Sequence, residues 1–181
     1  MVVSIDRRGF FRGIASAPAP QRPPWALPEH QFTSACDGCG ACIGACPQAI
    51  LVPAAGGLPR IDFSRGACIF CGQCVDACDR KAFAPRASRA PWELRAWISP
   101  ACLEPQGITC RVCETACDEA ALRFRPMTGG RAQVIVVRDR CTGCGACVAA
   151  CPVDALRLAA QSPAPAPGPE QPAPAPGAEQ R

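Results

Sequence analysis

The chain has 181 residues and a formal charge of +4 at pH 7; 49% of its residues are hydrophobic, but only 6% are aromatic and none is tyrosine. No basic helix with interleaved aromatic residues is visible, so the charge gives no support for nucleic-acid binding. No apolar stretch approaches the length of a membrane-spanning helix, and membrane insertion is therefore not expected. Sixteen cysteines dominate the composition, and they divide the chain into recognisable parts.

Residues 1–30 form a polar, proline-containing leader that is expected to be mostly unstructured. Its segment DRRGFFR, from Asp6 to Arg12, resembles a twin-arginine export motif. The residues that follow are few and broken by prolines, unlike the apolar region that such a signal requires. A cytoplasmic location is therefore predicted in preference to export, and reducing conditions there would keep thiols free.

Residues 31–84 contain two cysteine groups with one spacing, C-x-x-C-x-x-C-x-x-x-C. These groups are Cys36, Cys39, Cys42 and Cys46, followed by Cys68, Cys71, Cys74 and Cys78. Between the groups, residues 49–52 and 60–63 are predicted as short strands on either side of a turn at Gly56-Gly57. The segment is expected to be one small module.

Residues 85–100 are expected to connect this module to a second one. Trp92, Leu94 and Trp97 in this connector are predicted to pack the two modules together, with a partner-binding strip as the alternative. The second module is expected to span residues 101–160, and residues 133–137 form its clearest predicted strand because they are short, β-branched and apolar. Residues 161–181 are a Pro/Ala-rich tail that is predicted to be disordered.

The second module holds the other eight cysteines. The last group repeats the regular spacing at Cys141, Cys144, Cys147 and Cys151. The group before it consists of Cys102, Cys110, Cys113 and Cys117, and seven residues separate its first two cysteines. Glycine follows the second cysteine of every regular group, but Arg111 stands there in this stretched group. Its loop must therefore take a different path, with Pro105 and Gly107 available to turn the chain back.

The regular spacing is that of bacterial ferredoxins, whose cysteines bind [4Fe–4S] clusters. Three cysteines two residues apart can wrap three corners of a cubane, while the fourth points away and reaches the other cluster of the module. This crossed pattern predicts four ligand sets. Set 1 is Cys36, Cys39, Cys42 and Cys78; set 2 is Cys68, Cys71, Cys74 and Cys46; set 3 is Cys141, Cys144, Cys147 and Cys117; set 4 is Cys102, Cys110, Cys113 and Cys151.

The predicted fold is α+β, with two tandem two-cluster ferredoxin modules stabilised by their clusters. Three regular clusters are expected, together with an atypical fourth in set 4; loss of that cluster is the alternative. Disulfides and zinc are disfavoured, because neither requires three identical runs and the only histidine, His30, is far from the cysteines in sequence. Four clusters with their thiolates, at about −2 each, would make the loaded protein mildly acidic.

Several segments beyond the regular cysteine runs carry a resemblance to the NapF family. They are the leader Arg7-Arg8-Gly9, the segments Arg22-Pro-Pro-Trp25 and Arg89-Ala-Pro-Trp92, the stretched Cys102…Cys110-Arg-Val-Cys113…Cys117 group, and the closing run that begins at Cys141. The similarity covers roughly residues 5–160. NapF proteins are ferredoxin-type accessory proteins of the periplasmic nitrate reductase system.

The resemblance implies a cytoplasmic protein that acts on the catalytic molybdenum subunit of periplasmic nitrate reductase before export, helping to assemble or load its [4Fe–4S] cluster. The twin-arginine-like leader suggests a further hypothesis, that it imitates or competes with the signal of that subunit. The alternative function is a multi-cluster carrier that relays electrons to an oxidoreductase. An enzyme is not expected, because no catalytic dyad, nucleotide-binding loop or second cofactor site is visible.

Overall fold

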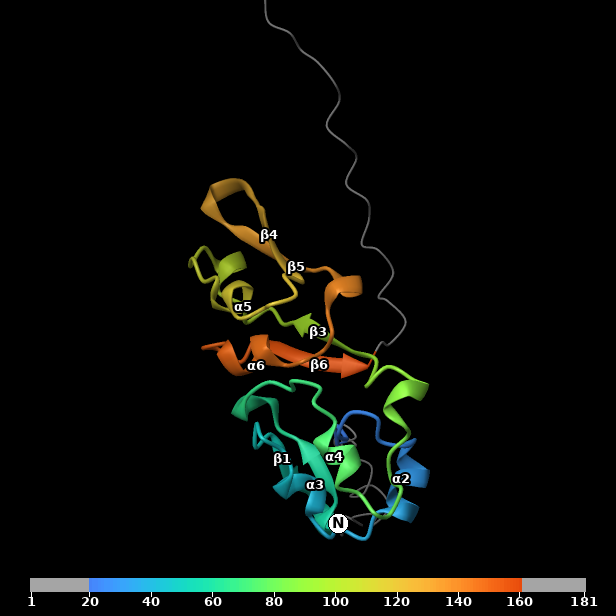
Figure 1. Cartoon of the computed structure of the whole chain (residues 1–181). Helices are drawn as coiled ribbons and strands as arrows, with labels where there is room; N and C mark the ends of the chain where they lie inside the picture. Colours follow the sequence, from blue (N-terminus) through green and yellow to red (C-terminus); the bar gives the residue numbers. More distant parts are fainter. Residues whose placement is uncertain (1–19, 161–181) are drawn as a thin grey trace, which may run out of the picture.

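The structure is a computed structural model, and it describes residues 20–160 (Figure 1). Its α-helices are α2 (Glu29–Ala35), α3 (Ala41–Gly44), α4 (Gln73–Asp76), α5 (Val112–Thr115) and α6 (Ala146–Ala150). Its strands are β1 (Leu51–Pro53), β2 (Pro59–Ile61), β3 (Leu94–Ile98), β4 (Leu122–Pro126), β5 (Ala132–Val136) and β6 (Leu156–Ala160). In this part of the chain, no helix is long and apolar enough to cross a bilayer. The Arg7-Arg8 motif and the 161–181 tail lie outside the described residues.

The strands form three separate antiparallel pairs: β1 with β2, β4 with β5, and β3 with β6. The strands predicted at residues 49–52, 60–63 and 133–137 correspond to β1, β2 and β5, with ends that differ by one or two residues. The expected turn between the first two is the 3-10 helix η2 (Ala55–Gly57). Short apolar runs bounded by glycine therefore located the first hairpin and strand β5 correctly, whereas β4, the partner of β5, was not predicted.

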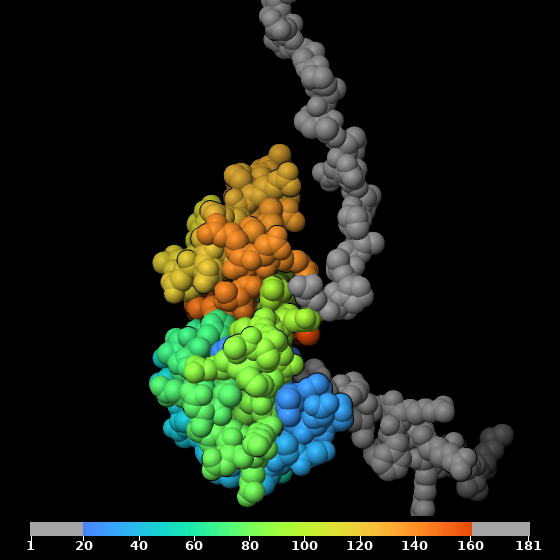
Figure 2. Space-filling view, turned by 45° about the vertical axis from the view of Figure 1, so that its right-hand side comes forward, coloured from blue at the N-terminus to red at the C-terminus, as the bar shows by residue number. Residues whose placement is uncertain are grey.

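The β3–β6 pair lies between the two modules (Figure 1), and Figure 2 shows the second module, in yellow and orange, packed on the first, in blue and green. Residues 94–98, which were expected to belong to the connector, instead form a strand that pairs with the end of the second module. Leu94 at the start of β3 belongs to the core of the first module, whereas Ala96 belongs to the core of the second. Val148 and Leu158 pack against both cores. The two modules therefore share packing across this sheet.

The packed part of the chain begins earlier than residue 31. Trp25 is buried, and an isolated bridge joins Ala26 to Phe83. The Leu27 N–H donates to the Ala82 carbonyl at 3.0 Å, and the Ala84 N–H donates to the Trp25 carbonyl at 2.8 Å. Residues 20–30 thus differ from the unstructured leader expected there, because they pair with the segment that leaves the first module.

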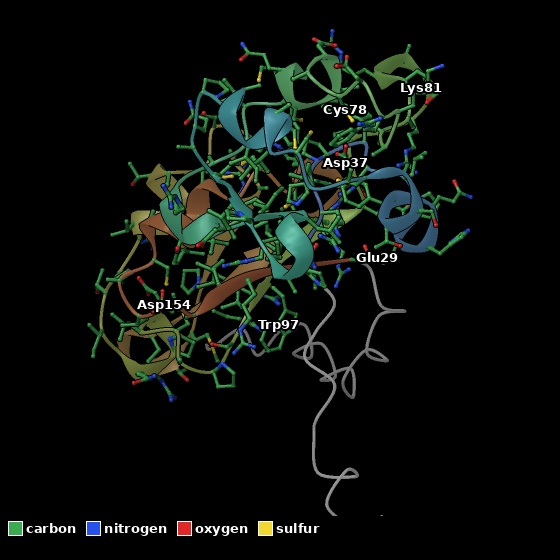
Figure 3. All side chains as sticks on the ribbon, turned by 90° about the horizontal axis from the view of Figure 1, so that it is seen from below. Glu29, Asp37, Cys78, Lys81, Trp97 and Asp154 are labelled. Carbon is green, nitrogen blue, oxygen red and sulfur yellow. The ribbon has the colours of Figure 1, made fainter. Side chains whose placement is uncertain are left out.

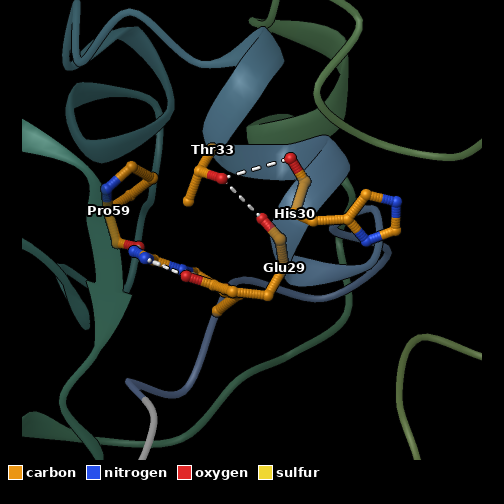
Figure 4. Close-up of polar contacts among 5 residues, drawn as sticks. Glu29, His30, Thr33 and Pro59 are labelled. Carbon is orange, nitrogen blue, oxygen red and sulfur yellow. Dashed lines mark hydrogen bonds and ion pairs between the residues drawn. The ribbon is translucent and has the colours of Figure 1, made fainter.

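An arginine holds this early segment against the first module. The Arg22 guanidinium forms an ion pair with Glu29, with 2.6 Å between the closest nitrogen and oxygen, and donates to the Pro59 carbonyl at 2.9 Å (Figure 4). In α2 the Thr33 hydroxyl donates to the Glu29 carbonyl at 2.9 Å (Figure 4). The Arg22 side chain is largely shielded from solvent, so these contacts hold residues 20–30 against β2.

The two Pro-Trp segments contact each other. The Trp25 N–H donates to the Pro91 carbonyl at 2.7 Å, and its indole Nε1 donates to the Arg89 carbonyl at 3.1 Å. Leu94 lies in the core of the first module and pairs with Ala160 of the second, and Trp92 packs against the first core and donates to the Thr142 carbonyl, so both residues join the two modules as predicted. Trp97 does not: its side chain lies on the outside of the β3–β6 pair and is 49% exposed (Figure 3). Residues alternate between the two faces of a strand, so Trp97 lies on the opposite face from Leu94 and Ala96.

Candidate iron–sulfur sites

The four cysteine groups share one local structure. In each group the third cysteine lies in the first turn of a short helix, and these cysteines are all buried: Cys42 in α3, Cys74 in α4, Cys113 in α5 and Cys147 in α6. In the regular groups the residue before the helix is glycine in the left-handed conformation, with φ of +78° at Gly40, +79° at Gly72 and +91° at Gly145. This is a region that glycine enters without steric cost.

Arg111 changes the path of the stretched group, as its sequence predicted. Its φ is −116°, so the chain enters α5 without the left-handed residue of the other three groups. The Arg111 guanidinium instead lies over the Phe124 ring, 4.7 Å from its centroid, and forms an ion pair with Glu114. The stretched group therefore leads into a short helix like those of the other groups, but with a different backbone conformation before it.

A second repeated feature was missed in the sequence. The residue three positions after each fourth cysteine has a positive φ, although none of the four is glycine: Ala49, Lys81, Ala120 and Asp154. The next residue is buried in every case, and in the second module its N–H donates to the fourth cysteine, at 3.3 Å from Ala121 to Cys117 Sγ and 3.2 Å from Ala155 to Cys151 Sγ. Lys81 and Asp154 lie far apart in Figure 3, so this turn recurs at distant places in the molecule. The four positions share no residue type that would have indicated this turn in the sequence.

The structure brings together the predicted ligand sets of the first module. Burial, reinforced by charge at Cys36, Cys78 and Cys39, raises the pKa of the Cys42 thiol to about 11. These four cysteines are set 1. The set 2 cysteines, Cys46, Cys68, Cys71 and Cys74, line one cavity together with apolar residues such as Ile50 and Leu51. The fourth cysteine of each group thus lies with the first three of the other group.

The second module repeats this arrangement. One cavity is lined by the set 3 cysteines, Cys117, Cys141, Cys144 and Cys147, and by Ala96, Leu122 and Leu158. In set 4, burial together with charge at Cys102, Cys110 and Cys151 raises the pKa of the Cys113 thiol to about 11. The structure thus places the cysteines of each predicted set near one another. That each set holds one cluster remains our proposal.

The donor chemistry of these sets fits [4Fe–4S] clusters. All sixteen thiols are free, and soft sulfur donors are the ligands that such clusters take. Backbone N–H groups point at several of the sulfurs, from Phe70 to Cys68 Sγ and from Ala96 to Cys141 Sγ at 3.4 Å each. Within residues 20–160, no three His, Cys, Asp or Glu side chains converge on a single metal position. Cubane ligands need no such convergence, because each thiolate binds a different iron.

The raised thiol pKa values show that bound iron must stabilise the thiolate form of these cysteines. Burial is the main cause at both Cys74 and Cys147, and each thiol has a pKa of about 12. Without metal these thiols stay protonated at neutral pH, because the low-polarity surroundings disfavour the thiolate. The positive charge of iron offsets this cost, so loading of the sites releases protons.

Glu104 organises the stretched group and was overlooked in the sequence. It begins the 3-10 helix η5 (Glu104–Gln106) inside the excursion between Cys102 and Cys110, and it is only 4% exposed. Its Oε1 accepts the Cys110 N–H at 2.7 Å. Gly107, with a φ of +85°, ends η5 and turns the chain back, which was the role expected for it. A glutamate in a loop gives no sequence signal of burial, since most are exposed.

Replacement of Glu104 by alanine is expected to empty set 4 selectively. The change leaves the Cys110 N–H without its acceptor, a loss of about 1–3 kcal/mol for a buried group. Iron should fall from about 16 to about 12 atoms per chain, with labile sulfide falling in parallel. Glu104→Gln keeps an oxygen acceptor of the same length and should retain the iron. Equal iron in the alanine and glutamine variants would show that this hydrogen bond does not hold the group.

Comparisons with known proteins agree with this arrangement. Residues 35–83 match a family model described as a 4Fe-4S dicluster domain, and residues 108–155 match a second model with the same description. The ferredoxin-type protein NapF of Escherichia coli K12 is 41% identical over 157 residues, which cover 86% of this chain and 95% of the relative. NapF of Haemophilus influenzae is 44% identical over 168 residues, which cover 87% and 95%. The chain belongs to the NapF family.

Membership of the NapF family confirms the predicted fold, two tandem 4Fe-4S dicluster domains of mixed helix and strand. It also confirms [4Fe–4S] clusters as the cofactor class. A related methylamine utilization ferredoxin-type protein, MauM of Methylorubrum extorquens, is 35% identical over 148 residues, which cover 72% of this chain and 67% of the relative. The second domain match begins after Cys102, so the stretched part of this NapF-family chain departs from the regular dicluster pattern.

Proposed function

We propose that this protein is an iron–sulfur accessory protein for the maturation of the catalytic subunit of periplasmic nitrate reductase, and that it helps to load the [4Fe–4S] cluster of that subunit before export. The similarity to NapF over 86% of the chain carries the proposal. The protein acts in the cytoplasm and has no substrate of its own. Its functional residues are the sixteen cysteines of sets 1–4.

Set 4 is the proposed source of the donated iron and sulfide. Its excursion depends on one buried carboxylate rather than on the tight loop of the regular groups. Three of the seven exposed large apolar side chains in residues 20–160 lie within two positions of its cysteines: Ile108, Val112 and Val153. Exposed apolar surface of this kind favours contact with another protein. A labile site beside such surface suits transfer to an immature subunit.

A transfer experiment with labelled iron tests this function. The full-length protein is loaded anaerobically with isotopically labelled iron, mixed with the apo catalytic subunit, and separated from it again. We expect the label and nitrate reductase activity to appear on the subunit together. Label that stays on this protein, with or without binding of the subunit, would count against donation. Glu104→Ala, which is expected to lack the set 4 cluster, should transfer little label, whereas Glu104→Gln should transfer as much as the wild type.

A further inference from the structure

The two modules meet at two cysteine loops. The Cys68 N–H, in the second cysteine group, donates to the Cys144 carbonyl, in the last group, at a short distance of 2.7 Å. Cys68 lines the cavity of set 2, and Cys144 lines the cavity of set 3. A single hydrogen bond therefore joins a ligand of the first module to a ligand of the second.

Aromatic side chains hold these loops together. The ring of buried Phe63 lies against Gly145, where an added Cβ would overlap the Phe63 Cδ1. Trp92 packs edge-on against Phe63 and Phe70, with ring centroids 5.9 and 5.5 Å apart, and its indole Nε1 donates to the Thr142 carbonyl at 3.1 Å. The contact thus involves both loops and the connector, and its close fit leaves no room for a side chain at position 145.

The ligand sets on either side of this junction are already linked within their modules. Cys46 belongs to the first cysteine group but lies in the cavity of set 2, and Cys117 belongs to the stretched group but lies in the cavity of set 3. The two cysteine groups of each module therefore meet through their fourth cysteines. The Cys68–Cys144 junction is the step that completes a series from set 1 through sets 2 and 3 to set 4.

We infer that the Cys68–Cys144 junction conducts electrons between the modules, so that the four ligand sets form one continuous path. Electron tunnelling weakens steeply with distance and is favoured by short hydrogen-bonded routes, and this junction provides such a route. One electron from a low-potential one-electron donor enters at one module, and one electron leaves to a one-electron acceptor at the other. No bond is made or broken and no proton is required. This inference goes beyond the proposed function and does not depend on cluster donation.

Two glycine variants separate the junction from its local backbone. Gly145→Ala places a methyl group against the Phe63 ring and should open the junction. Gly40→Ala is the matched control, because Gly40 follows the second cysteine of its group, also has a positive φ, and has no atom within 4 Å of an added Cβ. Both variants carry similar backbone strain. The double variant Phe63→Ala/Gly145→Ala restores space at the junction. Iron content first establishes which variants keep their clusters. Hydrogen exchange at the peptide that contains Cys68 then establishes in which variants the junction is open.

The decisive measurement is the kinetics of electron equilibration in the loaded full-length protein. A photoreductant delivers less than one electron per molecule, and rapid freezing with EPR spectroscopy follows its redistribution at several protein concentrations. In wild type and Gly40→Ala, we expect rates that do not change with concentration, because the electron moves within one molecule. Gly145→Ala should add a slower phase whose rate rises in proportion to concentration, and the double variant should reduce or remove it. A concentration-dependent phase in the wild type would overturn the inference without any variant. So would wild-type kinetics in a Gly145→Ala protein whose junction has been shown to be open.

Discussion

Removal of iron is expected to unfold most of this chain. The hydrophobic core of the second module has only five buried residues, and two of them are the cysteines Cys113 and Cys147. The helices that carry the cysteines are four or five residues long, well below the length of roughly 12–15 residues at which isolated helices become even marginally stable. The sheets have two strands each, which seldom suffice for independent stability. The clusters must therefore supply much of the core.

The measurement is the far-UV circular dichroism spectrum before and after anaerobic iron removal with a chelator and a thiol reductant. We expect most of the secondary-structure signal to disappear and the amide protons of β3 and β6 to exchange freely. Reconstitution with iron and sulfide in the absence of oxygen should restore the signal, which separates loss of clusters from irreversible damage. An unchanged spectrum after complete iron removal would show that the polypeptide holds this fold alone.

Crossed ligation predicts a non-additive pattern of cluster loss. Four cubanes correspond to about 16 iron atoms per chain, and the number of intact [4Fe–4S] clusters can be counted from iron, sulfide and Mössbauer spectra. Cys78→Ala should alter the cluster of set 1, although Cys78 belongs to the second cysteine group. Adding Cys36→Ala should cause no further loss, because both cysteines serve the same set.

The matched comparison adds Cys68→Ala to Cys78→Ala. These two cysteines belong to one sequence group but to different sets, so the double variant should lose two intact clusters instead of one. Ligation within each sequence group would give the opposite pattern, with two clusters lost for Cys78 and Cys36 and one for Cys78 and Cys68. The two outcomes differ by a whole cluster, which a direct count resolves.

The repeat of the cysteine spacing made much of this protein predictable. Ligand spacing is a local property: three cysteines two residues apart must lie on one loop, and the glycine after the second one marks its left-handed turn. The hairpin within residues 49–63 and the strand β5 are equally local, since glycine turns and short apolar runs specify them. The family also followed from local segments, including Arg89-Ala-Pro-Trp92 and the stretched group.

The positions that the sequence left open depend on contacts between distant residues. Trp25 pairs with Pro91 and Arg89, which are more than sixty residues away, so nothing near Trp25 distinguishes a packed segment from a flexible leader. Glu104 and Cys110 are only six residues apart, but no residue pattern indicated that the excursion would fold so that the buried Glu104 carboxylate accepts the Cys110 N–H.

The sequence by itself determined the cofactor class, the two-module α+β fold and the family, because cluster chemistry imposes a spacing that is written in consecutive residues. Only the tertiary structure decided how the modules join. The hydrogen bond from Cys68 to Cys144 and the packing of Phe63 on Gly145 bring together residues about eighty positions apart, and no local pattern encodes that approach. Such contacts form where the facing surfaces of the two modules are complementary in shape and are buried together.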